Sequence, residues 1–185
     1  LWSGNVRRFR EGYYITVGQQ PALPVGVHAF VLWAKLKGSV DGKYFLLSSR
    51  NTASAALPGV ELWVEDGKVG YIVCEDATAN KYSQALTREA VIQPDTWHCI
   101  AAYRNGTAYP AIYIDGAGVA VDTSGATGSW AIGTNDLVLG ERVGKSAGDG
   151  YTWNGLMSAV RYTTSPEVAA TYAQEASRYA ETPQA

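Results

Sequence analysis

Four residues of types that take part in catalysis lie close together in "DTWHCIAAYRNGTAYPAIYIDG" (95–116). Trp97, His98 and Cys99 are consecutive, and Asp115 stands at a later turn. A cysteine next to a histidine base is a nucleophile when both side chains converge within hydrogen-bond reach. The same residues also fit an ordinary β-hairpin. The direction in which each side chain points therefore decides between the two interpretations.

The alternation of side chains along a strand separates His98 from Cys99. The apolar pattern predicts a strand over residues 97–103, a turn at 105–106 and a return strand over 111–114. Neighbours on a strand point to opposite faces, so they cannot converge on one substrate. We therefore predict that His98 is a core or half-buried histidine without a catalytic role.

The composition fits a single domain with a substantial core, because the chain has 185 residues and 46% of them are hydrophobic. The net charge is -2 and the basic residues are scattered, which argues against a nucleic-acid surface. No apolar run approaches the roughly 20 residues of a membrane helix. No signal peptide is visible and the first residue is not Met, so we expect a processed product or an excised domain.

The two cysteines, Cys74 and Cys99, are too few for a disulfide scaffold and lack the spacing of a metal site. They either pair across strands or remain buried thiols. We favour buried thiols.

Many short strands separated by turns predict a β-sandwich or barrel. Strand-like segments occupy residues 28–38, 43–50, 59–76, 79–93, 97–103, 111–114, 118–123, 129–133, 136–144 and 156–163. The segment 59–76 is a hairpin around the turn pair Asp66-Gly67, and 79–93 is expected to be a pair of short segments.

The two ends of the chain differ from this middle part. Residues 1–27 contain two prolines and predict an N-terminal arm or edge segment. This segment is either a docking arm or a strand that closes the sandwich beside a partner near the C-terminus. Residues 28–164 form the sandwich. Residues 165–181 predict one amphipathic helix, with Ser165 as N-cap and Pro166 at its first position.

Several segments resemble laminin-G-like and concanavalin A-like jelly-roll domains, in the same order along the chain. They are the Trp-His segment, the hairpin "ELWVEDGKVGYIV", the strand "DLVLGERVG" and the closing "WNGLMSAVRYTTSPEVAATYA". The resemblance covers roughly residues 28–175. It implies an all-β, two-sheet antiparallel jelly-roll sandwich with one C-terminal α-helix. In that family the Trp-His segment is structural, in agreement with the alternation argument.

Enzymes of this fold provide one class of alternative function. Retaining glucanases of the fold carry acids at alternating positions of one strand, and "ELWVED" keeps Glu61 and Glu65 but has Trp63 between them. Four residues of strand separate the two acids by about 13 Å, whereas glycosidases need about 5–9.5 Å. Tyr82 and Gln84 suit a polysaccharide lyase, but no Gln-x-His strand accompanies them. We therefore expect no enzymatic activity.

Glycan recognition is the function that we predict, because exposed aromatic faces stack on sugar rings while amides and acids hold hydroxyl groups. The Gly-rich loop 145–155 is the first candidate site, with a second polar loop near residue 50. The alternative for Trp153 is packing over the end of the sandwich. The candidate ligand-binding residues are Tyr151, Trp153, Asn154, Arg50, Asn51 and Trp130.

Calcium is the one cofactor under consideration, since some lectin-like relatives bind it at a rim of loops. A calcium ion takes six to eight oxygen ligands. Asp149 and Asp136 are the candidate ligands, but they show no recognisable calcium spacing. The alternative for Asp149 is a turn former next to Gly150.

The expected partner is a glycan or a surface protein, at an extracellular, virion or cell-surface location, with no nucleic acid and no membrane insertion. The alternative is a structural or decoration protein of a virion or surface assembly, such as a phage head, tail or adhesin component. That alternative includes a homo-oligomer or a part of a larger assembly.

Overall fold

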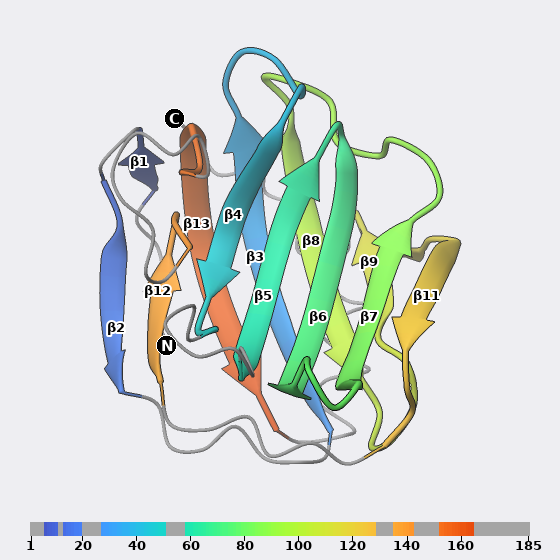
Figure 1. The fold of residues 1–185 in the computed structure, drawn as a ribbon. Coiled ribbons are helices and arrows are strands. Elements are labelled where there is room, and N and C mark those ends of the chain that lie inside the picture. The colour runs from blue at the N-terminus through green and yellow to red at the C-terminus, as the bar shows by residue number, and fades with distance from the viewer. Residues whose placement is uncertain are drawn as a thin grey trace.

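Two antiparallel β-sheets pack face to face in a computed structural model of the chain (Figure 1). The structure describes residues 6–10, 13–19, 27–50, 58–128, 135–142 and 152–164. The two layers confirm the predicted all-β jelly-roll sandwich. The predicted helix at 165–181 and the predicted strand at 129–133 lie outside the described residues. Within the described residues, no helix is long and apolar enough to cross a membrane.

The six-stranded sheet forms the rear layer in Figure 1. Each of its neighbouring strands pairs antiparallel. In spatial order its strands are β1 (Arg7–Phe9), β13 (Gly155–Thr163), β3 (His28–Leu36), β8 (Trp97–Arg104), β9 (Ala111–Ile114) and β10 (Ala117–Gly118).

The seven-stranded sheet forms the front layer, and its strands also pair antiparallel. Its central hairpin turns at Asp66-Gly67, where both residues have positive φ, 51° and 77°. This confirms the turn predicted from the residue pair. In spatial order the strands are β11 (Val121–Gly125), β7 (Lys81–Thr87), β6 (Lys68–Asp76), β5 (Gly59–Glu65), β4 (Lys43–Ser48), β12 (Asp136–Leu139) and β2 (Ile15–Gln19).

The core lies between the sheets and takes every second side chain of the central strands. On β5, Val60, Leu62 and Val64 enter the core. On β3, Phe30 and Leu32 do the same, whereas the intervening residues face outward. This period of two is the pattern expected for a sheet with one face buried.

The N-terminal segment contributes one strand to each sheet. β1 pairs with β13, so the segment closes the sandwich beside a strand near the C-terminus, and β2 is the last strand of the front sheet. Phe9 of β1 is buried in the core. Its ring lies so close to Gly140 that a Cβ on this glycine would clash with it.

Two predicted strand assignments are wrong. Only β7 forms in the region 79–93, because the backbone N–H groups of Val91 and Ile92 donate to the carbonyl of Gly67 in a neighbouring turn instead of to a strand. The segment 118–123 is divided between β10 and β11, which belong to different sheets. Sequence periodicity does not reveal the point at which a chain crosses between sheets.

One end of the core is polar. His28 of β3 lies opposite Arg104 of β8, and its Nε2 is 2.7 Å from the hydroxyl of Tyr71 in the other sheet. Arg104 is fully buried and donates to the carbonyl oxygens of Ala108 and Gly128. Burial lowers the pKa of Arg104 and raises the pKa of Tyr71. These bonds join the loops carrying the two carbonyls to the core.

The packing of β1 predicts that Phe9→Ala lowers the free energy of unfolding by about 3–5 kcal/mol, the usual cost of removing a buried aromatic side chain. Tyr14→Ala is the matched control because Tyr14 is 56% exposed, and it should change stability by less than about 0.5 kcal/mol. Urea denaturation measures both variants. Equal, small effects would contradict the assignment of β1 as a closing strand.

Candidate functional site

The Trp-His-Cys segment lies on β8 and serves the fold. His98 points to the same side of the sheet as Ile100, a core residue, as the alternation predicted. Cys99 packs on the outer face with Val31 and Ala101. The histidine and the thiol therefore lie on opposite sides of one sheet, and the two do not form a catalytic pair.

Asp115 is joined to His98 and Cys99 by hydrogen bonds. Its Oδ2 accepts a hydrogen bond from His98 Nδ1 at 2.8 Å, and its Oδ1 accepts one from the Cys99 backbone N–H at 2.8 Å. The backbone N–H of Gln93 donates to His98 Nε2 at 3.1 Å, so Nδ1 carries the proton. Asp115 begins the β9–β10 turn with φ 51°, a conformation that aspartate tolerates. The cluster closes a hairpin.

Both cysteines are free and buried, which confirms the thiol interpretation. Cys74 packs on the outer face of the seven-stranded sheet, and Cys99 packs on the outer face of the six-stranded sheet. The whole sandwich separates them. Burial raises the pKa of the Cys74 thiol, and burial with the nearby Asp115 carboxylate raises that of Cys99 to about 12.

The structure does not support the aromatic role predicted for Trp153. This side chain is fully buried in the core, and its Nε1 donates to the carbonyl of Leu156 at 3.3 Å. Its ring meets Tyr44 edge to face, so no indole face is left for a sugar. The prediction was wrong because an aromatic residue in a Gly-rich loop can point inward as well as outward. Asn154 is exposed, and its amide donates to the carbonyl of Lys37 at 3.2 Å.

Of the remaining predicted site residues, only some lie in the part of the chain that the structure describes. Asp136 is exposed at the start of β12. Within the described residues, no group of three or more acidic, histidine or cysteine side chains could hold a metal ion. Calcium binding therefore stays a prediction. The predicted residues that lie outside the described part are Tyr151, Asn51, Trp130 and Asp149.

A pocket of about 360 Å³ lies on the outer face of the seven-stranded sheet. Strands β4, β5 and β7 supply most of its lining, and one residue after β4 and one after β12 complete it. Its volume falls within the range of small-molecule sites, about 300–1,000 Å³. The lining residues are Lys43, Phe45, Arg50, Glu61, Trp63, Glu65, Gln84, Leu86 and Arg142.

Ion pairs hold the charged side chains of the pocket in place. Glu61 is buried and accepts from two arginines, Arg50 Nη1 at 3.1 Å and Arg142 Nε at 2.7 Å. Glu65 Oε2 accepts from Lys43 Nζ at 3.0 Å and from the indole N–H of Trp63 at 3.1 Å. The pocket thus contains three cationic side chains and two carboxylates, which gives it a net charge of +1.

Aromatic rings form the floor of the pocket. Trp63 lies over the neighbouring strand at Gly70, where an added Cβ would clash with the indole. Phe45 lies beside it, with ring centroids 6.4 Å apart. Lys43 Nζ sits 4.4 Å from the indole centroid, and the Arg142 guanidinium sits 5.4 Å from the Phe45 centroid. Cations over both rings give the pocket a rigid base.

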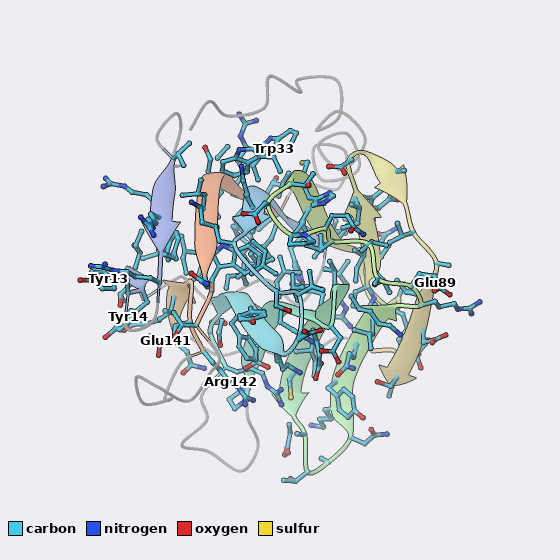
Figure 2. All side chains as sticks on the ribbon, turned by 90° about the horizontal axis from the view of Figure 1, so that it is seen from above. Tyr13, Tyr14, Trp33, Glu89, Glu141 and Arg142 are labelled. Atoms are coloured by element: carbon cyan, nitrogen blue, oxygen red, sulfur yellow. The ribbon has the colours of Figure 1, made fainter. Side chains whose placement is uncertain are left out.

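Figure 2 shows Arg142 on the side of the seven-stranded sheet and Trp33 on the opposite side, over the six-stranded sheet. Of the predicted ligand-binding residues, Arg50 lies in this pocket, and its role in binding stays a prediction. Sequence reasoning identified Glu61, Glu65 and Gln84 only as enzyme candidates and did not name Lys43 or Arg142. Lys43 lies directly opposite Glu65 in the pairing of β4 with β5, and no local pattern in the sequence shows this pairing. Arg142 follows a strand distant in sequence, and no local pattern links it to Glu61.

The sequence matches the family described as the concanavalin A-like lectin/glucanases superfamily over residues 9–166. The chain belongs to this superfamily. The match covers most of the chain, including β2–β13, and agrees with the resemblance found in the Trp-His segment and its neighbours. No curated protein matches the chain in sequence.

Solved structures with the same concanavalin A-like fold share little sequence with the chain. Domains LG4-5 of mouse laminin α1 are 16% identical (TM-score 0.62; 84% of this chain, 40% of that one), so the chain spans less than half of that fragment. The CBM40 of Ruminococcus gnavus IT-sialidase, bound to α2,3-sialyllactose, is 14% identical (TM-score 0.61; 87% and 92%). A native heptameric SAP-like pentraxin of Limulus polyphemus is 13% identical (TM-score 0.62; 91% and 80%). The TM-scores establish likeness of fold alone, because the sequence identities are low.

The hydrogen bonds of Asp115 predict that Asp115→Asn destabilises this concanavalin A-like domain by about 1–3 kcal/mol. Asparagine presents an N–H to either His98 Nδ1 or the Cys99 amide, so two donors face each other. Asp66→Asn is the matched control, because Asp66 also has positive φ and accepts a single bond, from the Gly42 amide. Thermal unfolding compares the two variants. Equal effects would show that Asp115 acts only through its turn geometry.

The raised thiol pKa values predict that neither Cys74 nor Cys99 reacts with Ellman's reagent in the native protein at pH 8. With a pKa of about 12, Cys99 is thiolate in roughly one molecule in ten thousand at that pH, and only the thiolate attacks. Reactivity should rise with pH toward that value. Two thiols should react after denaturation in guanidinium chloride, and rapid native labelling would contradict the assignment.

Proposed function

We propose that the chain is a non-catalytic carbohydrate-recognition module of laminin-G-like type, with its ligand in the outer-face pocket. One observation carries the proposal: polar groups without a partner among the described residues line a pocket with an aromatic floor. They include the amide of Gln84 and Oε1 of Glu65, beside the Trp63 ring.

These groups suit the chemistry of a sugar. A sugar hydroxyl both donates and accepts, so an amide can bind two neighbouring hydroxyls and a carboxylate oxygen can accept from a third. The ion pairs hold Glu65 before a ligand arrives, which lowers the entropic cost of binding. The C–H groups of the sugar ring find apolar surface on the partly exposed Leu86, whereas Trp63 is buried and forms the base beneath the ligand.

The superfamily supports the same function class. The Ruminococcus gnavus module of the same fold was solved with a bound sialyl-oligosaccharide, and mouse laminin α1 is another structural relative. A glycan-binding module of this type would act outside the cell or on a cell or virion surface. Its partner would be a glycan or a glycan-bearing surface protein.

The pocket carboxylates support a binding role over hydrolysis. A glycosidase needs one carboxyl that donates a proton and a second that acts as nucleophile or base. Glu61 is buried between two arginines, and Glu65 is bonded to Lys43 and Trp63. The two carboxyls also lie four strand residues apart, about 13 Å, which exceeds the separation of about 5–9.5 Å that glycosidases need.

A structural role in a surface assembly is the second candidate, and one observation favours it. Among the described residues, the large exposed hydrophobic side chains are Tyr13 (54%), Tyr14 (56%) and Val17 (47%), which cluster in and before β2. This strand ends the seven-stranded sheet, and sheet edges are common sites of association. The heptameric pentraxin shows that the fold occurs in oligomers.

A glycan array tests the proposed function, followed by calorimetry on the best ligand with wild type and Gln84→Ala. We expect wild type to bind defined glycans and Gln84→Ala to bind them about tenfold more weakly, because the amide contributes one or two hydrogen bonds. Gln93→Ala is the matched control, since its side chain is exposed outside the pocket.

The same protein should elute as a monomer in size-exclusion chromatography with light scattering. A silent array together with a stable oligomer would favour the structural candidate. Retained binding in a folded Gln84→Ala variant would place the ligand elsewhere on the domain.

A further inference from the structure

The charged groups of the pocket are distributed unevenly along β5. At one end, the single carboxylate of Glu61 faces the guanidinium groups of Arg50 and Arg142, so this end is positive. At the other end, Glu65 and Lys43 form a neutral pair. The two ends lie four residues apart on one strand, or about 13 Å. A ligand that spans the pocket therefore meets one cationic end and one neutral end.

Arg142 has the geometry of an anion receptor. Its Nε is bonded to Glu61, and among the described residues its two terminal NH₂ groups have no hydrogen-bond partner. Those two groups form the planar fork that binds a carboxylate or a sulfate through two parallel hydrogen bonds. The side chain of Arg142 is 21% exposed, whereas Arg50 and Glu61 are nearly covered. The buried carboxylate thus fixes the orientation of an accessible guanidinium.

We infer that the pocket recognises an acidic glycan, with the carboxylate or sulfate of one sugar bound to Arg142 at the positive end. The inference rests on the proposed function and specifies its ligand class. Glu61 is a positioning residue, because it acts on the ligand only through the two arginines. Gln84 and Glu65 take hydroxyl groups, so the charged end and the hydroxyl-binding end also set the direction of the glycan.

Calorimetry with matched glycan pairs tests the inference. The pairs are 3′-sialyllactose with lactose, 3′-sulfolactose with lactose, and an oligogalacturonate with its carboxyl-reduced form. We expect wild type to bind the acidic member of at least one pair about tenfold or more tightly than the neutral member. The first and third pairs report a carboxylate ligand, and the second reports a sulfate.

Variants of Arg142 assign the preference to one side chain. Arg142→Gln should abolish the acidic preference while retaining binding to neutral sugar, and Arg142→Lys should restore only part of it, because lysine keeps the charge but lacks the fork. Arg88→Gln is the matched control. Arg88 is an exposed arginine paired with Asp122 at the β7–β11 edge, outside the pocket, and its variant should keep the full preference.

The binding measurements distinguish failure of this inference from failure of the proposed function. If wild type binds acidic and neutral members equally, and Gln84→Ala weakens both, the glycan site stands and the acidic preference is overturned. If no glycan binds, the proposed function fails as well.

Salt titration provides a second measurement in case Arg142→Gln unfolds. Raising NaCl from about 50 to about 500 mM should weaken binding of the acidic member and leave the neutral member unchanged, because salt screens the charge at the pocket mouth. An acidic preference that does not respond to salt would overturn the assignment to Arg142.

Discussion

The two-residue repeat of a β-strand is the constraint on which this molecule depends. On β5, Val60, Leu62 and Val64 fill the core, so the residues between them must face outward. Those residues include Glu61 and Trp63, which line the pocket. One strand therefore builds the core with one face and the candidate site with the other. A shift of one residue in its register would exchange the two faces and destroy both.

Because the site is built on paired strands, its geometry is rigid. Glu61 is the clearest case, since a buried carboxylate is costly unless cations and hydrogen bonds compensate for lost hydration. Arg50 and Arg142 provide this compensation, one from a position before Glu61 in the chain and the other from a position after it. The same arrangement leaves the open side of one guanidinium at the pocket. The ion pairs that make burial of the Glu61 carboxylate tolerable therefore also orient the Arg142 guanidinium at the pocket.

The segment that first suggested catalysis serves the hairpin instead. His98, Cys99 and Asp115 are joined by hydrogen bonds that close the turn between β9 and β10. Buried polar groups in a sandwich need such hydrogen-bond partners, and a short loop offers few backbone donors and acceptors that can serve as partners. An aspartate with positive φ satisfies a side chain and an amide at once. A reactive combination of residue types can therefore be a consequence of hydrogen-bond satisfaction.

Local sequence patterns predicted much of the fold. Turn-bounded short segments predicted a sandwich, the Asp-Gly pair predicted the central turn, and alternation along β8 separated His98 from Cys99. These features depend on residues within a few positions of one another. The class of fold and the structural role of the Trp-His segment were therefore accessible from the sequence.

Only the tertiary structure decided where the candidate site lies. Arg142 reaches Glu61 across 81 positions of sequence, and Lys43 reaches Glu65 across 22. Sequence favoured Trp153 as a ligand contact, but the packing of the two sheets buries it. Alternation states that two faces of a strand differ, but it does not state which distant strands will lie beside it. The pocket is a product of strand order, which is set by the packing of the whole sandwich.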